Sequence, residues 1–207
     1  MANNNGSGKV GPEEHVRDFI GSCVRAGLLT DKQLRVEAVE AITAELPDRA
    51  DCAEDLAHAW VHEARNELLR DQGGWPEATD YDRLQTAFSE LETLDIVVLQ
   101  GIDDHWSAKA ELERRDALDQ LPDGIAWFTP PDVWHAVTEG MLEVNLWHGT
   151  TANAARGDAL LDDALAVFDK HGVPAHFDEG RIEVTARWQR RIADTVDHGQ
   201  SVDSLEP

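Results

Sequence analysis

One short segment, Asp103-Asp104-His105-Trp106, gathers the side chains best suited to chemistry. Two carboxylates and an imidazole could hold a divalent cation or polarise a water molecule. The segment follows the short β-branched run Ile96–Leu99, and open α/β sheets build binding crevices beyond the carboxyl ends of such strands. If the protein binds a metal, we therefore predict the site at Asp103, Asp104 and His105. The alternative is a solvated loop in which Asp104 caps the next helix and His105 points outward.

The other histidines give a weaker metal signal. His58 and His62 lie at i, i+4 on one face of a predicted helix, which is a ligand spacing, but Ala59 stands where an HExxH motif needs glutamate. Three more histidines come from segments of the second half and show no zinc-site spacing: His135, His148 and His176. Scattered histidines are the simpler interpretation. We predict no cofactor, with a bound divalent cation as the alternative.

No nucleophile is indicated. Cys23 lies on an apolar helical stripe, and Cys52 is flanked by Asp51 and Glu54, which raise the pKa of a nearby thiol. The sequence contains no Gly-x-Ser-x-Gly elbow, Walker loop or Gly-x-Gly-x-x-Gly turn, so we predict no catalytic residue. Two cysteines are too few for a disulfide scaffold, which favours a reduced, cytoplasmic protein.

The first half of the chain must supply helices. Between residues 12 and 93, apolar side chains recur at spacings of three and four, a pattern that predicts four helices. Gly27 ends the first helix, Thr30 and Gln33 have capping-box spacing for the second, and Pro47 ends it. Asp51 is the predicted cap of the third helix.

The second half of the sequence combines the apolar periodicities of strands and helices. Ile96–Leu99 and Ile125–Phe128 are typical of buried strands. In the next predicted strand, Leu142, Val144 and Leu146 alternate with Glu143, Asn145 and Trp147, as in a strand with one face buried. A tight hairpin is predicted at Asp178-Glu179-Gly180, with an antiparallel edge there and some parallel pairing between helix-joined strands.

These elements predict an α+β fold, with an N-terminal helical bundle followed by a mixed α/β sheet and a C-terminal β-hairpin. The predicted organisation is a disordered leader at residues 1–11, a helical subdomain at 12–93, an α/β subdomain at 94–191 and a flexible tail at 192–207. No apolar run is long enough for a membrane span.

Charge is the main global property. The chain has 41 acidic residues against 18 Lys and Arg, a formal net charge of −23, and 22 of the acids lie between residues 51 and 150. Such a field repels nucleic acid and anionic membranes, and it attracts basic partners or cations. We therefore predict a protein partner with a basic surface, no direct nucleic-acid binding and no membrane binding.

Several segments carry a resemblance over roughly residues 14–191: Trp75-Pro76, Asp80-Tyr81-Asp82-Arg83-Leu84, Ala87-Phe88, Leu91-Glu92, Ile96-Val97, Gly124-Ile125-Ala126-Trp127-Phe128, and Arg181-Ile182 with Trp188. In these the chain resembles an uncharacterised actinobacterial family, a domain of unknown function, which implies no activity, cofactor or partner. The resemblance implies a Cys-Cys-x-x-Cys cluster after the first strand, where this chain has Asp103, Asp104 and Ser107. Without sulfur, soft-metal or thiol chemistry cannot operate there.

The leading hypothesis from the sequence is a non-enzymatic, acidic protein-interaction or regulatory module. Trp147 is its predicted interaction residue, on one strand face with Glu143 and Asn145, because exposed tryptophans often anchor interfaces. Two alternatives stay open. One is a metal-assisted hydrolase that uses Asp103, Asp104 and His105, and the other is an antagonist protein that mimics nucleic acid.

Overall fold

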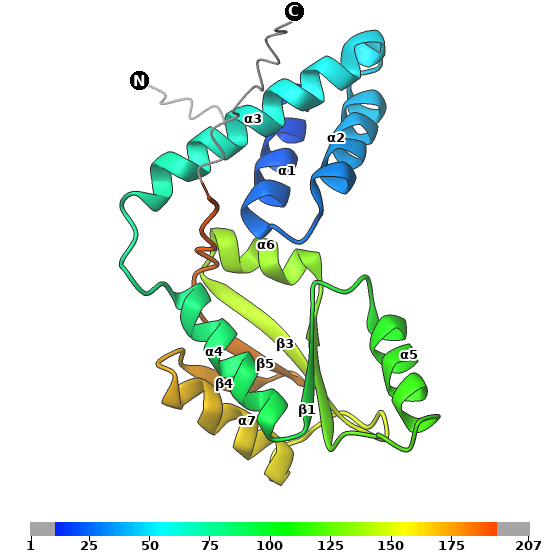
Figure 1. Ribbon diagram of the computed structural model, residues 1–207, viewed down its shortest axis with the longest axis vertical. Coiled ribbons are helices and arrows are strands. Elements are labelled where there is room, and N and C mark those ends of the chain that lie inside the picture. The colour runs from blue at the N-terminus through cyan, green and yellow to red at the C-terminus, as the bar shows by residue number, and fades with distance from the viewer. Residues whose placement is uncertain (1–10, 194–207) are drawn as a thin grey trace, which may run out of the picture.

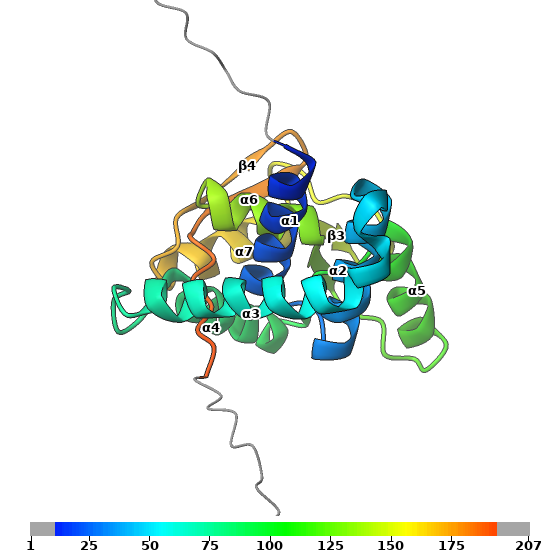
Figure 2. The ribbon, with the colours of Figure 1, turned by 90° about the horizontal axis from the view of Figure 1, so that it is seen from above.

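The N-terminal part of the protein is a bundle of three helices. The computed structural model describes residues 11–193, and the bundle consists of α1 (Pro12–Ala26), α2 (Asp31–Glu45) and α3 (Ala53–Gln72). Seen from above, α3 crosses the width of the molecule, and α1 and α2 lie beneath it (Figure 2). Their apolar stripes meet in a common core that includes Ile20, Ile42 and Trp60. The bundle accounts for three of the four helices predicted between residues 12 and 93, whereas the fourth, Asp80–Thr93, packs with the sheet.

The ends of these helices follow the local sequence signals, with one exception. Gly27 ends α1 in the left-handed conformation (φ 61°), and Thr30 and Gln33 form the predicted capping box of α2. The predicted cap at Asp51 is wrong. Residues Pro47–Cys52 form a 3₁₀ helix that contains Asp51, and α3 follows it directly without a side-chain cap. The proline opens this extra turn because its fixed φ suits a helical first turn.

The second half contains five strands and four helices within residues 80–185. In chain order these are α4 (Asp80–Thr93), β1 (Ile96–Gln100), α5 (His105–Asp116), β2 (Gly124–Phe128), α6 (Pro130–Thr138), β3 (Met141–His148), α7 (Ala159–Lys170), β4 (Ala175–Asp178) and β5 (Arg181–Thr185). The strand order is β1-β2-β3-β5-β4. Only β1 and β2 are parallel, and the other neighbours are antiparallel. The fold class is therefore α+β, as predicted.

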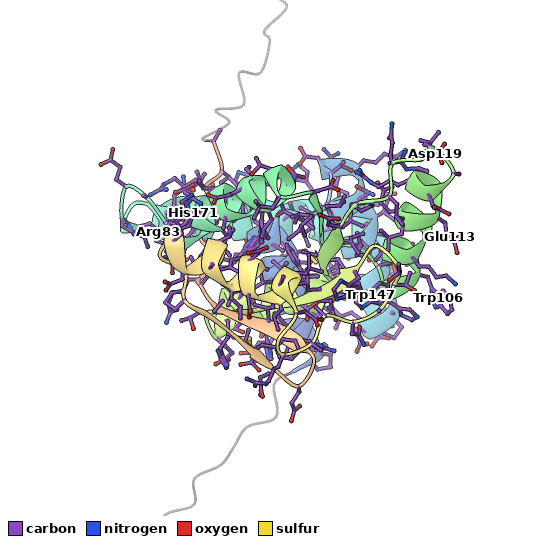
Figure 3. All side chains as sticks on the ribbon, turned by 90° about the horizontal axis from the view of Figure 1, so that it is seen from below. Arg83, Trp106, Glu113, Asp119, Trp147 and His171 are labelled. Atoms are coloured by element: carbon purple, nitrogen blue, oxygen red, sulfur yellow. The ribbon has the colours of Figure 1, made fainter. Side chains whose placement is uncertain are left out.

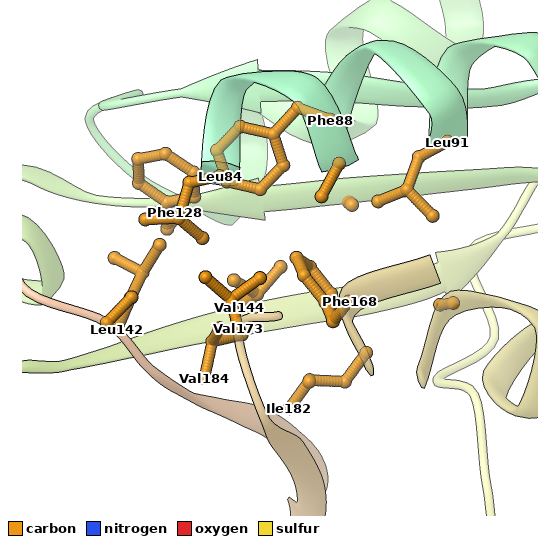
Figure 4. Packing of buried hydrophobic residues seen from close by; sticks show 14 of the residues in the cluster. Leu84, Phe88, Leu91, Phe128, Leu142, Val144, Phe168, Val173, Ile182 and Val184 are labelled. Carbon is orange, nitrogen blue, oxygen red and sulfur yellow. The ribbon is translucent and has the colours of Figure 1, made fainter. Parts of the chain in front are cut away.

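Helices cover the two faces of the sheet unequally. α4 and α7 lie on one face and α5 lies on the other, while α6 sits between the sheet and the helical bundle (Figure 1). The main core fills the space between the sheet and α4 and α7, with Phe88, Phe128 and Phe168 among its largest members (Figure 4). The smaller core under α5 holds Ala108, Leu112, Ile125 and Trp127 and is more open.

One strand differs from its prediction. β2 is buried along its whole length, but in β1 only Ile96 is buried, and Val97, Val98 and Leu99 are half-buried. The reason is topological: β1 is an edge strand that pairs with β2 alone. Apolar runs of this kind are typical of fully buried strands, but composition does not reveal position within a sheet.

The closing hairpin has the expected geometry. Glu179 (φ 44°) and Gly180 (φ 89°) both have positive φ, as the two central residues of a type I′ turn require. The turn joins β4 and β5, and β4 forms the second edge of the sheet.

The two halves of the chain contact each other through aromatic and C-terminal residues. The rings of Phe19 in α1 and Trp134 in α6 pack edge to face at 6.0 Å. The Trp188 indole N–H donates to the carbonyl of Ala26 at 3.0 Å, and Ile192 exchanges two backbone–side-chain hydrogen bonds with Gln72. Whether residues 12–93 and 94–191 fold separately stays a prediction.

Two predicted features cannot be compared with the structure in full. The leader at residues 1–11 and the tail at 192–207 lie, except for residues 11, 192 and 193, outside the described residues. Within residues 11–193, none of the helices combines the length and the apolar character needed to cross a membrane.

Candidate functional site

The segment Asp103–Trp106 lies where β1 passes into α5. β1 ends at Gln100 and α5 begins at His105, so the segment follows the carboxyl end of the strand as predicted. The Asp104 carboxylate accepts hydrogen bonds from the backbone N–H groups of Trp106 (2.9 Å) and Ser107 (3.2 Å). Asp104 is therefore the N-cap of α5, which is the alternative interpretation of this residue.

The structure gives the metal hypothesis no ligand set. Within the described part of the chain, no group of three or more His, Cys, Asp or Glu side chains is placed to share one ion. His148 instead pairs with Asp158 at 3.0 Å, and this hydrogen bond holds the pKa of the Asp158 carboxyl below its usual value. His176 pairs with Glu183 at 3.3 Å. A cation at Asp103, Asp104 and His105 stays a prediction.

The same segment contributes to a group of aromatic rings, which we call the aromatic cluster: Trp106, His105, Trp147 and Trp127. His105 stacks on Trp106 with a centroid distance of 4.6 Å and contacts Trp147 at 6.5 Å. Trp147 in turn packs edge to face on Trp127 at 5.4 Å. In the view from below, Trp106 and Trp147 are both labelled on the side of the molecule where α5 lies (Figure 3). Residues from α5, β2 and β3 thus form one continuous aromatic path.

Exposure increases along this path. Trp127 is 6% exposed, Trp147 is half-buried, and Trp106 is 60% exposed, the largest value among the exposed large apolar residues of the described chain. The outer end of the cluster is thus an exposed indole supported from below by packed rings. An exposed aromatic surface with a rigid base is a common feature of interface anchors.

The inner end of the cluster has an unusual polar atom. The Trp127 indole nitrogen is buried and has no hydrogen-bond partner within residues 11–193. A buried N–H without an acceptor costs about 1–3 kcal/mol. The neighbouring Trp147 ring, inclined by 78°, offers at most the weak attraction of an edge-to-face contact.

The predicted interaction residues of β3 are placed as their alternation indicated. Glu143, Asn145 and Trp147 are half-buried on one face, and the intervening residues are buried. Only part of this set joins the cluster. The Asn145 amide lies 3.5 Å from the carbonyl of Trp127, whereas Glu143 forms an ion pair with Arg181 on β5.

Trp106 is the residue that sequence reasoning missed as an interaction candidate. The signal was present in the helical period, because Ala108 and Leu112 define the buried face of α5 and Trp106 is two residues, or about 200°, away from Ala108. What the period could not reveal is that its neighbour His105 contacts Trp147 of a distant strand.

Acidic side chains surround α5. The exposed acids on or next to this helix are Asp103, Asp104, Glu113, Asp116, Asp119 and Asp123. The nearby cations are mostly engaged, since Arg114 and Arg115 both bind Glu111 at 2.7 Å. The bond from Arg114, with help from Arg115, lowers the pKa of Glu111 to about 2. Lys109 lies 5.4 Å from the centre of the Trp106 ring and 3.7 Å from Glu113.

Comparison with known proteins gives one finding. A family model described as "Domain of unknown function (DUF6891)" matches residues 11–192. The comparison with curated proteins and the comparison with solved structures gave no match.

Proposed function

The chain belongs to the DUF6891 family, whose description assigns no activity, and for this member we propose a non-enzymatic role as an acidic protein-interaction module. The exposed outer end of the aromatic cluster, Trp106, is its anchor, and the partner presents a basic surface. The observation that carries this proposal is the 60% exposure of a tryptophan whose ring packs on His105, which in turn contacts Trp147.

The chemistry of the anchor favours a protein partner. Tryptophan residues are over-represented among interface hot spots because a rigid ring buries a large area at a small entropic cost. A ring that already packs on His105 loses less further freedom on binding than a free one. The single exposed indole is small compared with a full interface, so the surrounding acids must make up the rim of the contact surface.

The charge around the anchor favours a basic partner. Six exposed acids lie on or next to α5, while Arg114 and Arg115 are already bound to Glu111. Acidic rims speed association with basic surfaces and slow it with acidic ones. Arginine and lysine side chains of a partner could also stack on the Trp106 face, as Lys109 does from its own side.

A pull-down with matched baits tests the proposal. Wild type, Trp106→Ala and Leu118→Ala are immobilised and exposed to an extract of the native cytoplasm. Leu118 is the control because it is 55% exposed and follows the same helix outside the cluster. We expect wild type and Leu118→Ala to retain a basic protein that Trp106→Ala loses.

Binding kinetics of that protein then separate anchor from charge. Truncating a hot-spot tryptophan weakens affinity by about 2 kcal/mol or more, roughly 30-fold, mainly through faster dissociation. Raising salt should slow association instead, because exposed charges are screened beyond about 8–10 Å at physiological ionic strength. A captured partner that binds Trp106→Ala as tightly as wild type would refute the anchor, and one whose association ignores salt would refute the role of the acids.

A further inference from the structure

A groove in the helical bundle has a composition unlike the rest of the molecule. It has a volume of about 800 Å³ and is bounded by α1, α2, α3 and residues 190–193. Its apolar side chains include Cys23, Val24, Leu34 and Val61. Volumes of roughly 300–1,000 Å³ are typical of small-molecule sites.

The polar side chains of this groove are cationic or neutral with one exception. Arg35, Arg65, Arg190 and Arg191 all line it, and the single carboxylate among the lining residues is that of Asp31. A concentration of arginines is unexpected in a chain with a formal charge of −23. Like charges brought into one groove repel each other, so the arrangement calls for a counter-charge.

Two of the four arginines have their counter-charge within the protein. Arg65 binds Asp31 at 2.5 Å, and Arg191 lies 3.4 Å from Asp82. Arg35 and Arg190 differ, because no carboxylate within residues 11–193 forms an ion pair with either. Most other arginines of this acidic chain have such a pair, as Arg17 does twice.

The protein backbone holds Arg190 in position. Its guanidinium lies against Gly27, and a Cβ at that residue would overlap it. Gly27 follows the last turn of α1, where the carbonyl end of a helix attracts positive charge. The guanidinium is thus placed by a helix end, and no carboxylate of residues 11–193 pairs with it.

The floor of the groove is chemically inert. Burial raises the pKa of the Cys23 thiol to about 11, so this thiol is neutral at pH 7 and acts as part of the apolar surface. His58, His62 and Asn66 of α3 add hydrogen-bonding groups along the wall, and the Asn66 amide lies 3.0 Å from Nδ1 of His62.

We propose that this groove binds a small organic anion, a carboxylate or phosphate attached to an apolar body. The anionic group meets Arg35 and Arg190, since guanidinium groups donate to carboxylate and phosphate in a fixed fork. The apolar body lies on the floor formed by Val24, Leu34 and Val61. The His58 and His62 pair, a metal candidate from its spacing, serves here as part of the wall.

Isothermal titration of the full chain with three probes tests the proposal. Hexyl phosphate carries both chemical parts, inorganic phosphate carries only the charge, and hexanol carries only the apolar body. We expect hexyl phosphate to bind at least about tenfold more tightly than either fragment, because only it combines a paired charge with a buried apolar body. Equal affinities of hexyl phosphate and inorganic phosphate would overturn the proposal.

Two substitutions locate the site. Arg35→Gln should weaken hexyl phosphate binding about tenfold, the usual effect of losing one charge-assisted hydrogen bond. Arg70→Gln is the matched control, because Arg70 is an exposed cation on α3 outside the groove. Circular dichroism checks that Arg35→Gln and Arg70→Gln fold. Arg190→Gln repeats the test at the second arginine without an ion pair in residues 11–193. Equal weakening by Arg35→Gln and Arg70→Gln would show a general charge effect and refute the site.

One further experiment distinguishes a free small anion from a lipid headgroup. Sedimentation with phosphatidylcholine vesicles containing phosphatidic acid asks whether the groove takes a lipid headgroup from a membrane. We expect none of the protein to sediment, because its acidic surface repels an anionic bilayer. Sedimentation that is lost in Arg35→Gln would overturn the assignment of a free small ligand.

Discussion

Two buried tryptophans form a matched pair that tests how the aromatic cluster is built. Trp127 is 6% exposed and Trp188 is 4% exposed, so both indoles are removed from water. They differ in one hydrogen bond: the Trp188 N–H donates to Ala26 at 3.0 Å, and the Trp127 N–H has no partner in residues 11–193. Replacing each by phenylalanine removes the same atoms from a buried environment, and the difference between the two variants isolates the N–H.

The expected difference follows from the hydrogen bonds. Trp188→Phe leaves the Ala26 carbonyl without its donor, which costs about 1–3 kcal/mol beyond the lost packing. Trp127→Phe removes an unpaired donor and recovers a similar amount, about 1–3 kcal/mol, against the same packing loss. Trp188→Phe should therefore be less stable than Trp127→Phe by at least about 2 kcal/mol, or about 4–8 °C in Tm for a chain of this length.

Urea unfolding followed by far-ultraviolet circular dichroism measures both free energies of unfolding. Tryptophan fluorescence is unsuitable because the substitutions remove fluorophores. The comparison holds if the dependence on urea is the same in both variants, since an altered slope would signal a change in the unfolded state. Equal destabilisation by the two substitutions would refute the reasoning, and it would mean that the Trp147 ring satisfies the Trp127 N–H as well as a carbonyl would.

Three further substitutions have expected outcomes of their own. Asp104→Ala should lower the free energy of unfolding by about 1 kcal/mol because the α5 cap is lost, whereas Asp104→Asn keeps an acceptor and should stay within about 0.5 kcal/mol of wild type. If the wild type binds Mg²⁺, Mn²⁺, Zn²⁺ or Ca²⁺ more tightly than millimolar and either change abolishes this binding, the result would instead support the metal hypothesis. Arg114 lowers the pKa of Glu111 to about 2, so the contribution of Glu111 to stability is full above its unfolded pKa of about 4.3 and is lost as pH falls toward 2. Glu111→Gln should therefore reduce the fall of Tm between these two pH values. An unchanged fall of Tm would contradict the cause given for the lowered pKa. Val97→Asp, on the half-buried edge strand β1, should lower the free energy of unfolding by about 1–2 kcal/mol. Ala126→Asp, in the buried strand β2, should lower it by more than about 4 kcal/mol in the same urea assay. Equal effects would contradict the strand order.

The helical bundle and the hairpin could be predicted because their signals are local. The Thr30–Gln33 capping box, Gly27 and the Glu179-Gly180 turn each act within a few residues of themselves. The cap of α4 was not predicted, although Thr79 and Asp82 form the same reciprocal pair of hydrogen bonds. Aspartate replaces the usual Glu or Gln at the third position, and the shorter side chain still reaches the backbone N–H.

The sheet order and the candidate site could not be predicted because they depend on distant residues. Nothing within Ile96–Leu99 shows that a single neighbouring strand pairs with it. Trp147 was placed on the correct face by alternation, but its partners His105 and Trp127 come from two other elements. Likewise, the spacing of His58 and His62 indicated one helix face and could not indicate that Arg190, more than a hundred residues later, lies in the same groove.

The contacts of Trp188 and Ile192 with the helical bundle have a consequence for how a nascent chain matures. Helices α1–α3 leave the ribosome first and have mainly local contacts with one another, so they can assemble while the rest is being translated. The donor to the Ala26 carbonyl nevertheless lies 162 residues further along the chain, and Ile192 lies 120 residues after its partner Gln72. Arg190, which lines the groove, is synthesised equally late. A translation product that ends before Arg190 therefore lacks part of the lining of the proposed anion site.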